Sequence, residues 1–165
     1  MLRLVIWSGG QTGVDRAALD FAIHTDRPYG GWCPRGGWAE DLTTPPGLLA
    51  IYPRLLETPS RAPEQRTAWN VRDSHATLIV VRGEALHRSP GTQLTKQLAE
   101  LVFLRPYRIV NLTEPHAIEA GRSWLTQVAH LWPDDELVIN IAGPRESEDP
   151  GIYADTLKFL TAIFS

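Results

Sequence analysis

The sequence predicts an α/β fold: a doubly wound, mostly parallel sheet with helices on both faces. Strand-like and helix-like segments alternate along the 165 residues, which is typical of this class. The strand-like runs are almost continuously apolar, as expected for strands that are buried on both faces. Glycine-rich and polar motifs follow these runs directly, at the edge where parallel sheets bind ligands. The strand-like runs are residues 4–7, 76–81, 108–112 and 137–142.

Helix-like segments lie between or after the strand-like runs. Pro115 and Pro150 stand just before the last two of them, where proline favours the start of a helix. In the second helix-like segment, apolar side chains recur at helical spacing, at Leu94, Leu98, Leu101 and Val102. We expect helices at residues 12–24, 92–104, 119–131 and 152–164.

Residues 28–63 depart from this alternation because they are rich in proline, glycine and arginine. A short strand is expected at residues 29–32. A loop of this length in a small domain is usually functional or disordered. Its aromatic side chains argue against disorder: Tyr29, Trp32, Trp38 and Tyr52. No repeat or linker divides the chain, so we expect one ligand-binding domain over residues 1–165.

Composition narrows the classes of function. Hydrophobic residues make up 43% of the chain and charged residues 21%, which is ordinary for a soluble protein. A net charge of -3 argues against nucleic acid as the main partner. No apolar run approaches the roughly 20 residues of a membrane span, and the N-terminus lacks the layout of a secretory signal. We therefore expect a cytoplasmic protein without a membrane partner.

The segment at residues 8–16, SGGQTGVDR, carries the strongest functional signal. It joins an apolar run to a helix-like run through a glycine turn. Glycines at Gly9, Gly10 and Gly13 allow the backbone to approach a ligand closely. The first amides of a helix lie at the positive end of its dipole, so phosphate is the natural ligand there. A tight turn without a ligand is the alternative.

The side chains of this motif differ in what they can do. Thr12 and Asp15 are placed to cap the helix, so both have a structural role available. Gln11 has no such role and is better placed to contact a ligand. Arg16 can neutralise a phosphate or pair with a carboxylate, and the sequence does not separate the two.

A second motif lies at residues 30–41, GGWCPRGGWAED. Arg35 beside Gly36 offers a forked donor for phosphate or carboxylate. Trp32 and Trp38 can stack on a flat heterocycle, and the side chains of Glu40 and Asp41 can accept hydrogen bonds from its edge. A surface loop held by tryptophans is the alternative. Cys33, the single cysteine, excludes an intrachain disulfide and is either an inert buried thiol or a soft metal ligand.

Three further motifs lie in the later part of the chain. Arg66, Asn70 and Asp73 share one face if residues 66–73 are helical; that face either contacts the ligand or is simply solvated. A glycine turn recurs at Gly83 and at Gly91-Thr92, the latter opening a helix. Arg145 and Glu146 leave the sheet after a Gly-Pro turn. They either pair with each other, or Arg145 binds an anion.

Several catalytic patterns are missing from the sequence. It has no Ser-His-Asp arrangement, no P-loop lysine and no histidine–carboxylate spacing for a metal. The five histidines are scattered. We therefore expect no catalytic residue and no metal ligand.

These motifs together resemble the molybdenum carrier family, and the resemblance spans nearly the whole chain. The matching blocks are residues 8–20, 30–36, 39–41, 57–58, 66–67, 70–71, 73–74, 91–92, 94–95, 142–147 and 150–153. That family is similar to the lysine-decarboxylase-like, or SLOG, Rossmann superfamily, which includes cytokinin-activating phosphoribohydrolases. The resemblance implies a Rossmann-like sheet, a homo-oligomer (dimer or tetramer) and a phosphorylated ligand in the glycine cleft. For some members the implied ligand is molybdenum cofactor, or molybdopterin.

The chain departs from its relatives at two places. Pro90 stands where the family usually has a second glycine, which stiffens the turn and removes one backbone donor. The phosphoribohydrolases have a glutamate in the following helix, whereas this chain has no acid before Glu100. Nucleotide hydrolysis by their mechanism is therefore disfavoured.

The preferred interpretation is a binding and carrier protein for a phosphorylated pterin. The alternative is a nucleotide-binding protein, or an enzyme resembling a nucleoside-monophosphate phosphoribohydrolase. Such an enzyme needs a carboxylate beside the ribose, and the candidates are Asp15, Glu40, Asp41 and Asp73. The residues predicted to bind the ligand are Gly9, Gly10, Gln11, Thr12, Gly13, Arg16, Trp32, Arg35, Gly36, Glu40, Asp41, Asn70, Gly83, Gly91, Thr92 and Arg145.

Overall fold

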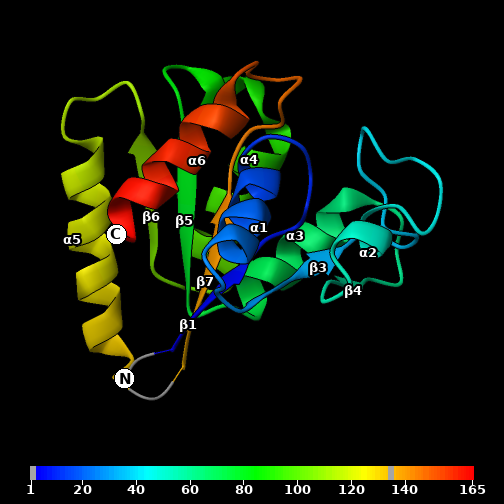
Figure 1. Ribbon diagram of the computed structural model, residues 1–165, viewed down its shortest axis with the longest axis horizontal. Coiled ribbons are helices and arrows are strands. Elements are labelled where there is room, and N and C mark those ends of the chain that lie inside the picture. Colours follow the sequence, from blue (N-terminus) through cyan, green and yellow to red (C-terminus); the bar gives the residue numbers. More distant parts are fainter. Residues whose placement is uncertain (1–2, 134–135) are drawn as a thin grey trace.

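The computed structural model describes residues 3–133 and 136–165. Five parallel strands form the centre of the protein (Figure 1). All neighbouring strands run parallel, which confirms the predicted sheet. Because every strand points the same way, the turns that follow them gather at one edge. The strands, in spatial order, are β2 (Tyr29–Gly30), β1 (Arg3–Trp7), β7 (Glu136–Ala142), β5 (Ala76–Val81) and β6 (Tyr107–Asn111).

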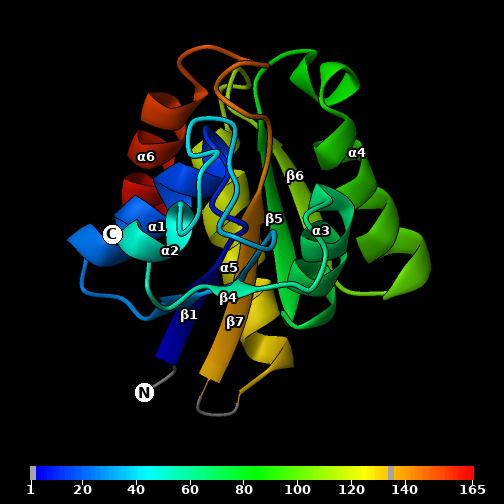
Figure 2. The same cartoon turned by 90° about the vertical axis from the view of Figure 1, so that its right-hand side faces the viewer.

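Helices cover both faces of this sheet (Figure 2). One layer contains α1 (Val14–His24), α5 (Ala117–Leu131) and α6 (Ile152–Ile163), with α6 packed against the other two. The other layer contains α3 (Pro63–Arg72), α4 (Pro90–Gln97) and the π-helical turn η2 (Leu98–Val102). A short 3₁₀ turn, η1 (Ala85–Arg88), precedes α4. The doubly wound arrangement is therefore the one that the sequence predicts.

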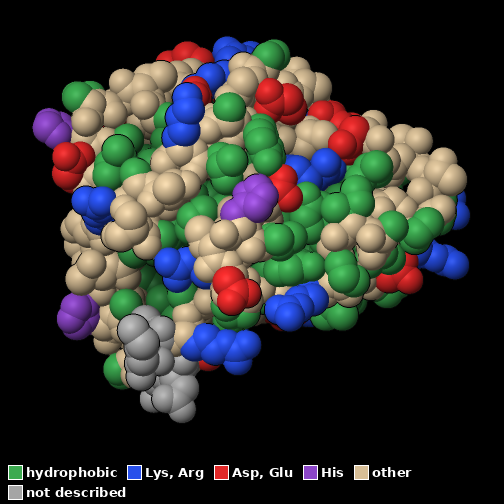
Figure 3. All heavy atoms as spheres, viewed as in Figure 1, with side chains coloured by type: hydrophobic (Ala, Val, Ile, Leu, Met, Phe, Trp, Pro, Cys, Tyr) green, Lys and Arg blue, Asp and Glu red, His purple; other side chains and the backbone are tan. Residues whose placement is uncertain are grey.

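Burial explains why the central strands read as unbroken apolar runs. All six residues of β5 are buried, as are Leu137 to Ile141 of β7. Leu78, Ile139 and Ile141 are fully buried between the two helical layers. At the surface, basic and acidic side chains are interspersed on the face that Figure 3 shows. Among residues 3–133 and 136–165, no helix is both long enough and apolar enough to cross a membrane.

The predicted short strand at residues 29–32 is divided at Gly31. Tyr29–Gly30 joins the main sheet, whereas β3 (Trp32–Cys33) pairs with β4 (Leu56–Glu57) in a separate two-stranded sheet. Gly31 has φ 131°, and a Cβ there would lie 2.1 Å from the Ser8 carbonyl oxygen. The chain can therefore turn away from the main sheet only at a residue without a side chain.

Residues 28–63 fold around their own buried cluster, which includes the short helix α2 (Leu48–Ile51). Leu19 of α1 belongs to this cluster, so the segment is attached to the main body through α1. The cluster consists of Leu19, Cys33, Ala39, Leu48, Tyr52 and Leu55.

Two predicted helix boundaries shift for local reasons. The helix expected at residues 12–24 begins at Val14, because Gly13 has φ 81° and cannot be a helical residue. The helix expected at residues 92–104 begins earlier, at Pro90, since the fixed φ of proline suits the first helical position. Its C-terminal part continues as the π-helical turn η2.

Replacing Gly13 by alanine should destabilise the fold by at least about 2 kcal/mol. Residue 13 has a positive φ, and an added Cβ would lie 2.3 Å from the Pro144 carbonyl oxygen. Gly91→Ala is the matched control, because nothing lies within 4 Å of the added Cβ; it should change stability by no more than about 1 kcal/mol. Urea denaturation followed by tryptophan fluorescence measures both. Equal stability of the two variants would contradict the prediction.

Candidate functional site

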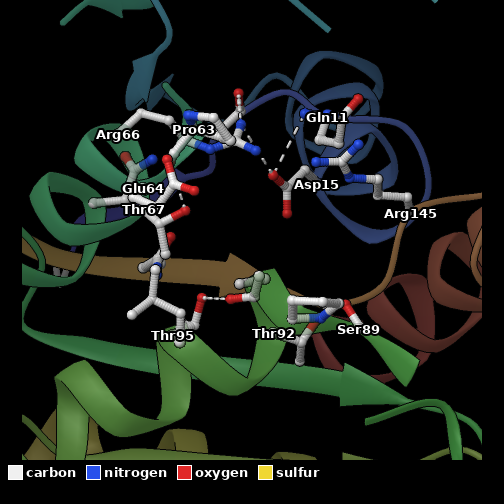
Figure 4. A pocket seen from close by; sticks show the side chains of 18 of the residues that line it. Gln11, Asp15, Pro63, Glu64, Arg66, Thr67, Ser89, Thr92, Thr95 and Arg145 are labelled. Atoms are coloured by element: carbon white, nitrogen blue, oxygen red, sulfur yellow. Dashed lines mark hydrogen bonds and ion pairs between the residues drawn. The ribbon is translucent and has the colours of Figure 1, made fainter. Parts of the chain in front are cut away.

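A cavity of about 280 Å³ opens at the carboxyl edge of the sheet, between the β1–α1 turn and the start of α4 (Figure 4). The predicted convergence of the turns at one edge is therefore present in the fold. The volume of this cavity is near the lower end of the range for small-molecule sites, roughly 300–1,000 Å³. The predicted ligand-binding residues that line it are Gly9, Gln11, Asn70, Gly91, Thr92 and Arg145.

Asp15 and Arg66 form a buried pair on one side of the cavity. Their exposed fractions are 8% and 7%, and Arg66 Nη1 lies 3.9 Å from Asp15 Oδ2. Arg66 also donates to the Gly9 carbonyl at 2.9 Å. Burial raises the pKa of Asp15 to about 6, against the opposing effect of the Arg66 guanidinium. The cavity thus contains a carboxyl group that exchanges its proton near neutral pH.

Gln11 has a buried hydrogen-bond donor without an acceptor. The Gln11 Oε1 atom accepts from the amides of Thr12 at 3.1 Å and Glu40 at 3.0 Å, which fixes the side chain. The Nε2 atom has no partner within the part of the chain that the structure describes, although the residue is only 3% exposed. A buried donor left unpaired costs roughly 1–3 kcal/mol. Gln11 is therefore a polar residue of the cavity lining whose side-chain donor the described part of the protein does not use.

The opposite side of the cavity is the start of α4 (Figure 4). The hydroxyl oxygens of Ser89 and Thr92 lie 2.6 Å apart, and Ser89 Oγ donates to the Glu148 carboxylate at 2.9 Å. Glu148 also accepts from the Arg145 amide at 2.9 Å, which ties the turn after β7 to this helix. The first turn of α4 therefore faces the cavity with the positive end of its dipole.

Several predicted binding side chains are instead engaged with one another outside the lining. Arg16 makes two bonds to the Asp41 carboxylate, at 2.9 and 2.8 Å, so the carboxylate alternative for Arg16 is the one observed. The same bonds lower the pKa of Asp41. Glu40 accepts from the hydroxyls of Thr12 and Ser147. Although burial acts to raise it, the pKa of Glu40 is lowered by these bonds.

Thr12 does not cap α1, although the sequence allows it that role. The N-cap position of α1 belongs to Gly13 and has no side-chain cap. The Thr12 hydroxyl instead donates to Glu40 and accepts from the Glu146 amide at 3.2 Å. Glu146 in turn accepts from the amides of Gly151 and Tyr153 at the start of α6. These bonds join three chain turns at the rim of the cavity.

Asn70, Trp32, Gly83 and Gly10 make contacts within the protein. Asn70 makes two hydrogen bonds to the Trp32 backbone, at 2.8 and 2.9 Å, and so holds α3 against β3. The Trp32 indole donates to Asp73 at 2.8 Å, away from the cavity lining. The Gly83 amide donates to Asn111 Oδ1 at 2.9 Å. Gly10 lies against the side chains of Leu48 and Leu55, which pack within 3.3 Å of where its Cβ would be. Arg35 and Gly36 lie in a second cavity.

Some lining residues were not among those predicted from sequence. Asn140 is a buried polar residue inside the apolar strand β7, which is a signal that sequence inspection can detect. Ser89 and Glu148 give no such signal, because their roles depend on contacts between distant turns. Cys33 is fully buried, and burial raises the pKa of its thiol to about 11. Residues 3–133 and 136–165 contain no cluster of three or more His, Cys, Asp or Glu side chains that could hold a metal ion.

The fold and cavity define a Rossmann-like α/β protein with a ligand-type cavity at the carboxyl edge of its sheet. The chain belongs to the Circularly permutated YpsA SLOG family, which it matches over residues 6–164. It is also similar to a crystal structure of a protein from Syntrophus aciditrophicus SB named "Putative molybdenum carrier protein". The two are 36% identical, with a TM-score of 0.82 over 99% of this chain and 96% of the other. A comparison with curated proteins found no match.

Asp15→Asn should remove a pH-dependent part of the stability. The folded protein retains the Asp15 proton between its ordinary pKa of 3.8 and about 6, so it binds more protons than the unfolded chain in this window. Stability therefore falls as pH rises through the window. The stability of the wild type relative to Asp15→Asn should fall by about 2 kcal/mol between pH 4 and pH 7.

Urea denaturation of both proteins at these two pH values measures the difference. The constant cost of losing the contact with Arg66 cancels in this comparison. A difference that is the same at both pH values would show that the Asp15 carboxyl titrates like an exposed one.

Proposed function

We propose that the protein binds and carries molybdenum cofactor, holding its phosphorylated pterin in the cavity beside Gln11. Two findings support this proposal. The first is the family, together with the name of the similar protein from Syntrophus aciditrophicus SB. The second is the chemistry of the cavity lining, which offers polar groups to a heterocycle on one side and a helix start on the other.

The unpartnered Gln11 Nε2 is the observation that carries the proposal. A pterin ring presents hydrogen-bond acceptors and N–H donors along the same edge. Gln11 Nε2 would donate to a ring acceptor, while the Asp15 carboxylate would accept from a ring N–H. The buried Arg66 keeps Asp15 available as an acceptor, because it favours the charged form of the carboxyl group.

The phosphate of the cofactor fits the other side of the cavity. There the first turn of α4, at Gly91 and Thr92, offers the positive end of a helix dipole. Arg145 lines the same cavity and supplies a positive charge, with its Nη1 atom 3.7 Å from Glu40 Oε2. Pro90 has no N–H, so fewer backbone donors surround the phosphate than in a glycine-rich loop. The dithiolene of the cofactor holds the molybdenum, so the chain itself needs no metal ligand.

Gln11→Ala should reduce the amount of cofactor that co-purifies with the protein by about tenfold, because it removes the buried donor that the ligand satisfies. Protein produced in a host that makes the cofactor is assayed for molybdenum by mass spectrometry and for oxidised pterin by fluorescence. The matched control is Gln127→Ala, an exposed glutamine of α5 outside the cavity. Wild-type protein and this control should contain equal amounts of molybdenum and pterin.

Two results would overturn the proposal. One is wild-type protein without pterin and molybdenum from such a host. The other is unchanged loading of a folded Gln11→Ala variant, which would place the ligand elsewhere.

A second candidate function is cleavage of the N-glycosidic bond of a nucleoside monophosphate. Asp15 favours it, because a carboxyl group with a pKa of about 6 in a cavity is suited to general acid–base catalysis. The other sequence-derived candidates are disfavoured. Glu40, Asp41 and Asp73 do not line the cavity, and each is bonded to basic or hydroxyl side chains.

Incubation with AMP, GMP and CMP separates the two functions. The carrier proposal predicts no release of free base above the uncatalysed rate, measured by liquid chromatography. Release that disappears in Asp15→Asn but persists in Asp73→Asn would identify an enzyme with Asp15 at its centre.

A further inference from the structure

A second cavity, of about 370 Å³, lies beside the first and plays no part in the proposed pterin site. It is formed by residues of the 28–63 segment together with the start of α3. Trp38 and two prolines give it apolar walls, and two arginines, Arg35 and Arg61, give it charge. The Arg35 amide donates to the Ser60 carbonyl at 2.9 Å, and the Gly36 amide donates to Glu57 at 2.8 Å. These bonds fix the backbone of the cavity wall.

The two cavities share a wall. Pro63, the first residue of α3, lines both of them. The guanidinium of Arg145, which lines the first cavity, lies 5.8 Å from the ring centre of Trp38, which lines the second. The two cavities are therefore neighbours, separated by Pro63.

The charge of the second cavity differs from that of the first. Asp15, Glu64 and Glu148 line the first cavity beside two arginines, whereas no carboxylate lines the second. Within residues 3–133 and 136–165, no ion pair involves Arg35 or Arg61, and both residues are exposed. Two guanidinium groups without a counter-ion beside an indole ring suit an anion that is attached to a flat ring.

We propose that the second cavity binds a nucleoside monophosphate unit. Its base would stack on Trp38, and its phosphate would bind Arg35 and Arg61 through forked, charge-assisted hydrogen bonds. This site is separate from the proposed pterin site, so neither proposal depends on the other.

Calorimetric titration of the purified protein with AMP, GMP and CMP tests the inference. At least one of them should bind. The double variant Arg35→Ala/Arg61→Ala should weaken that binding at least about tenfold, since two charge-assisted hydrogen bonds are lost. Arg54→Ala is the matched control, because Arg54 lies over Tyr29 and lines neither cavity. Gln11→Ala should also leave the affinity unchanged within about twofold, because it alters only the first cavity.

Three results would overturn the inference: no binding of any of the three nucleotides at about 1 mM, equal affinity of wild type and the double arginine variant, or loss of binding in Gln11→Ala alone. The proposed function is tested separately, by pterin and molybdenum content and by Gln11→Ala. Pterin-loaded protein that binds no nucleotide would therefore refute only the second cavity. Nucleotide binding through Arg35 and Arg61 without any pterin would refute only the carrier proposal.

Discussion

The cavity depends on one buried guanidinium, that of Arg66. It extends from α3 to the β1–α1 turn, where it donates to the Gly9 carbonyl and lies beside the Asp15 carboxylate. A Cβ on residue 9 would lie 2.6 Å from Arg66 Nη1, so the approach requires glycine there. Burying two charges is costly unless they are paired and hydrogen-bonded. The glycine turn and the arginine are therefore a single structural unit, and the polar side of the cavity exists because both are present.

The strand order explains why distant motifs meet at this unit. β7 is last in the sequence but lies at the centre of the sheet, between β1 and β5. If the C-terminal helix α6 were joined to β1, then β7, β1 and β2 would be consecutive strands from the centre of the sheet to one edge. This is the relation between a doubly wound protein and its circular permutant, in agreement with the description of the family. Because β7 pairs with β1, the turn that contains Arg145 meets the turn that follows the first strand.

The sequence was sufficient for the fold because the signals that define it are local. Continuous apolar runs mark β5 and β7, and the alternation of segments gives the parallel sheet. The site was only partly predictable. Gly9 and Gln11 belong to a local strand–turn–helix pattern, which sequence inspection detects. Arg16 and Glu40 are charged side chains of the same kinds as those that line the cavity. Their bonds to Asp41 and Thr12 show that they lie at the rim instead. Tertiary packing sets these contacts, so the sequence alone does not reveal them.

The rim contacts also bear on whether the protein holds or transforms its ligand. Bonds among Thr12, Glu40, Glu146 and the start of α6 connect the turns after β1 and β7 into one rigid frame. A donor in such a frame, Gln11 Nε2, binds without a large ordering cost, which favours affinity. Catalysis requires interactions that strengthen in the transition state, and Asp15 is a lining carboxyl group whose pKa burial raises to about 6. A frame of this kind is suited to retaining a ligand.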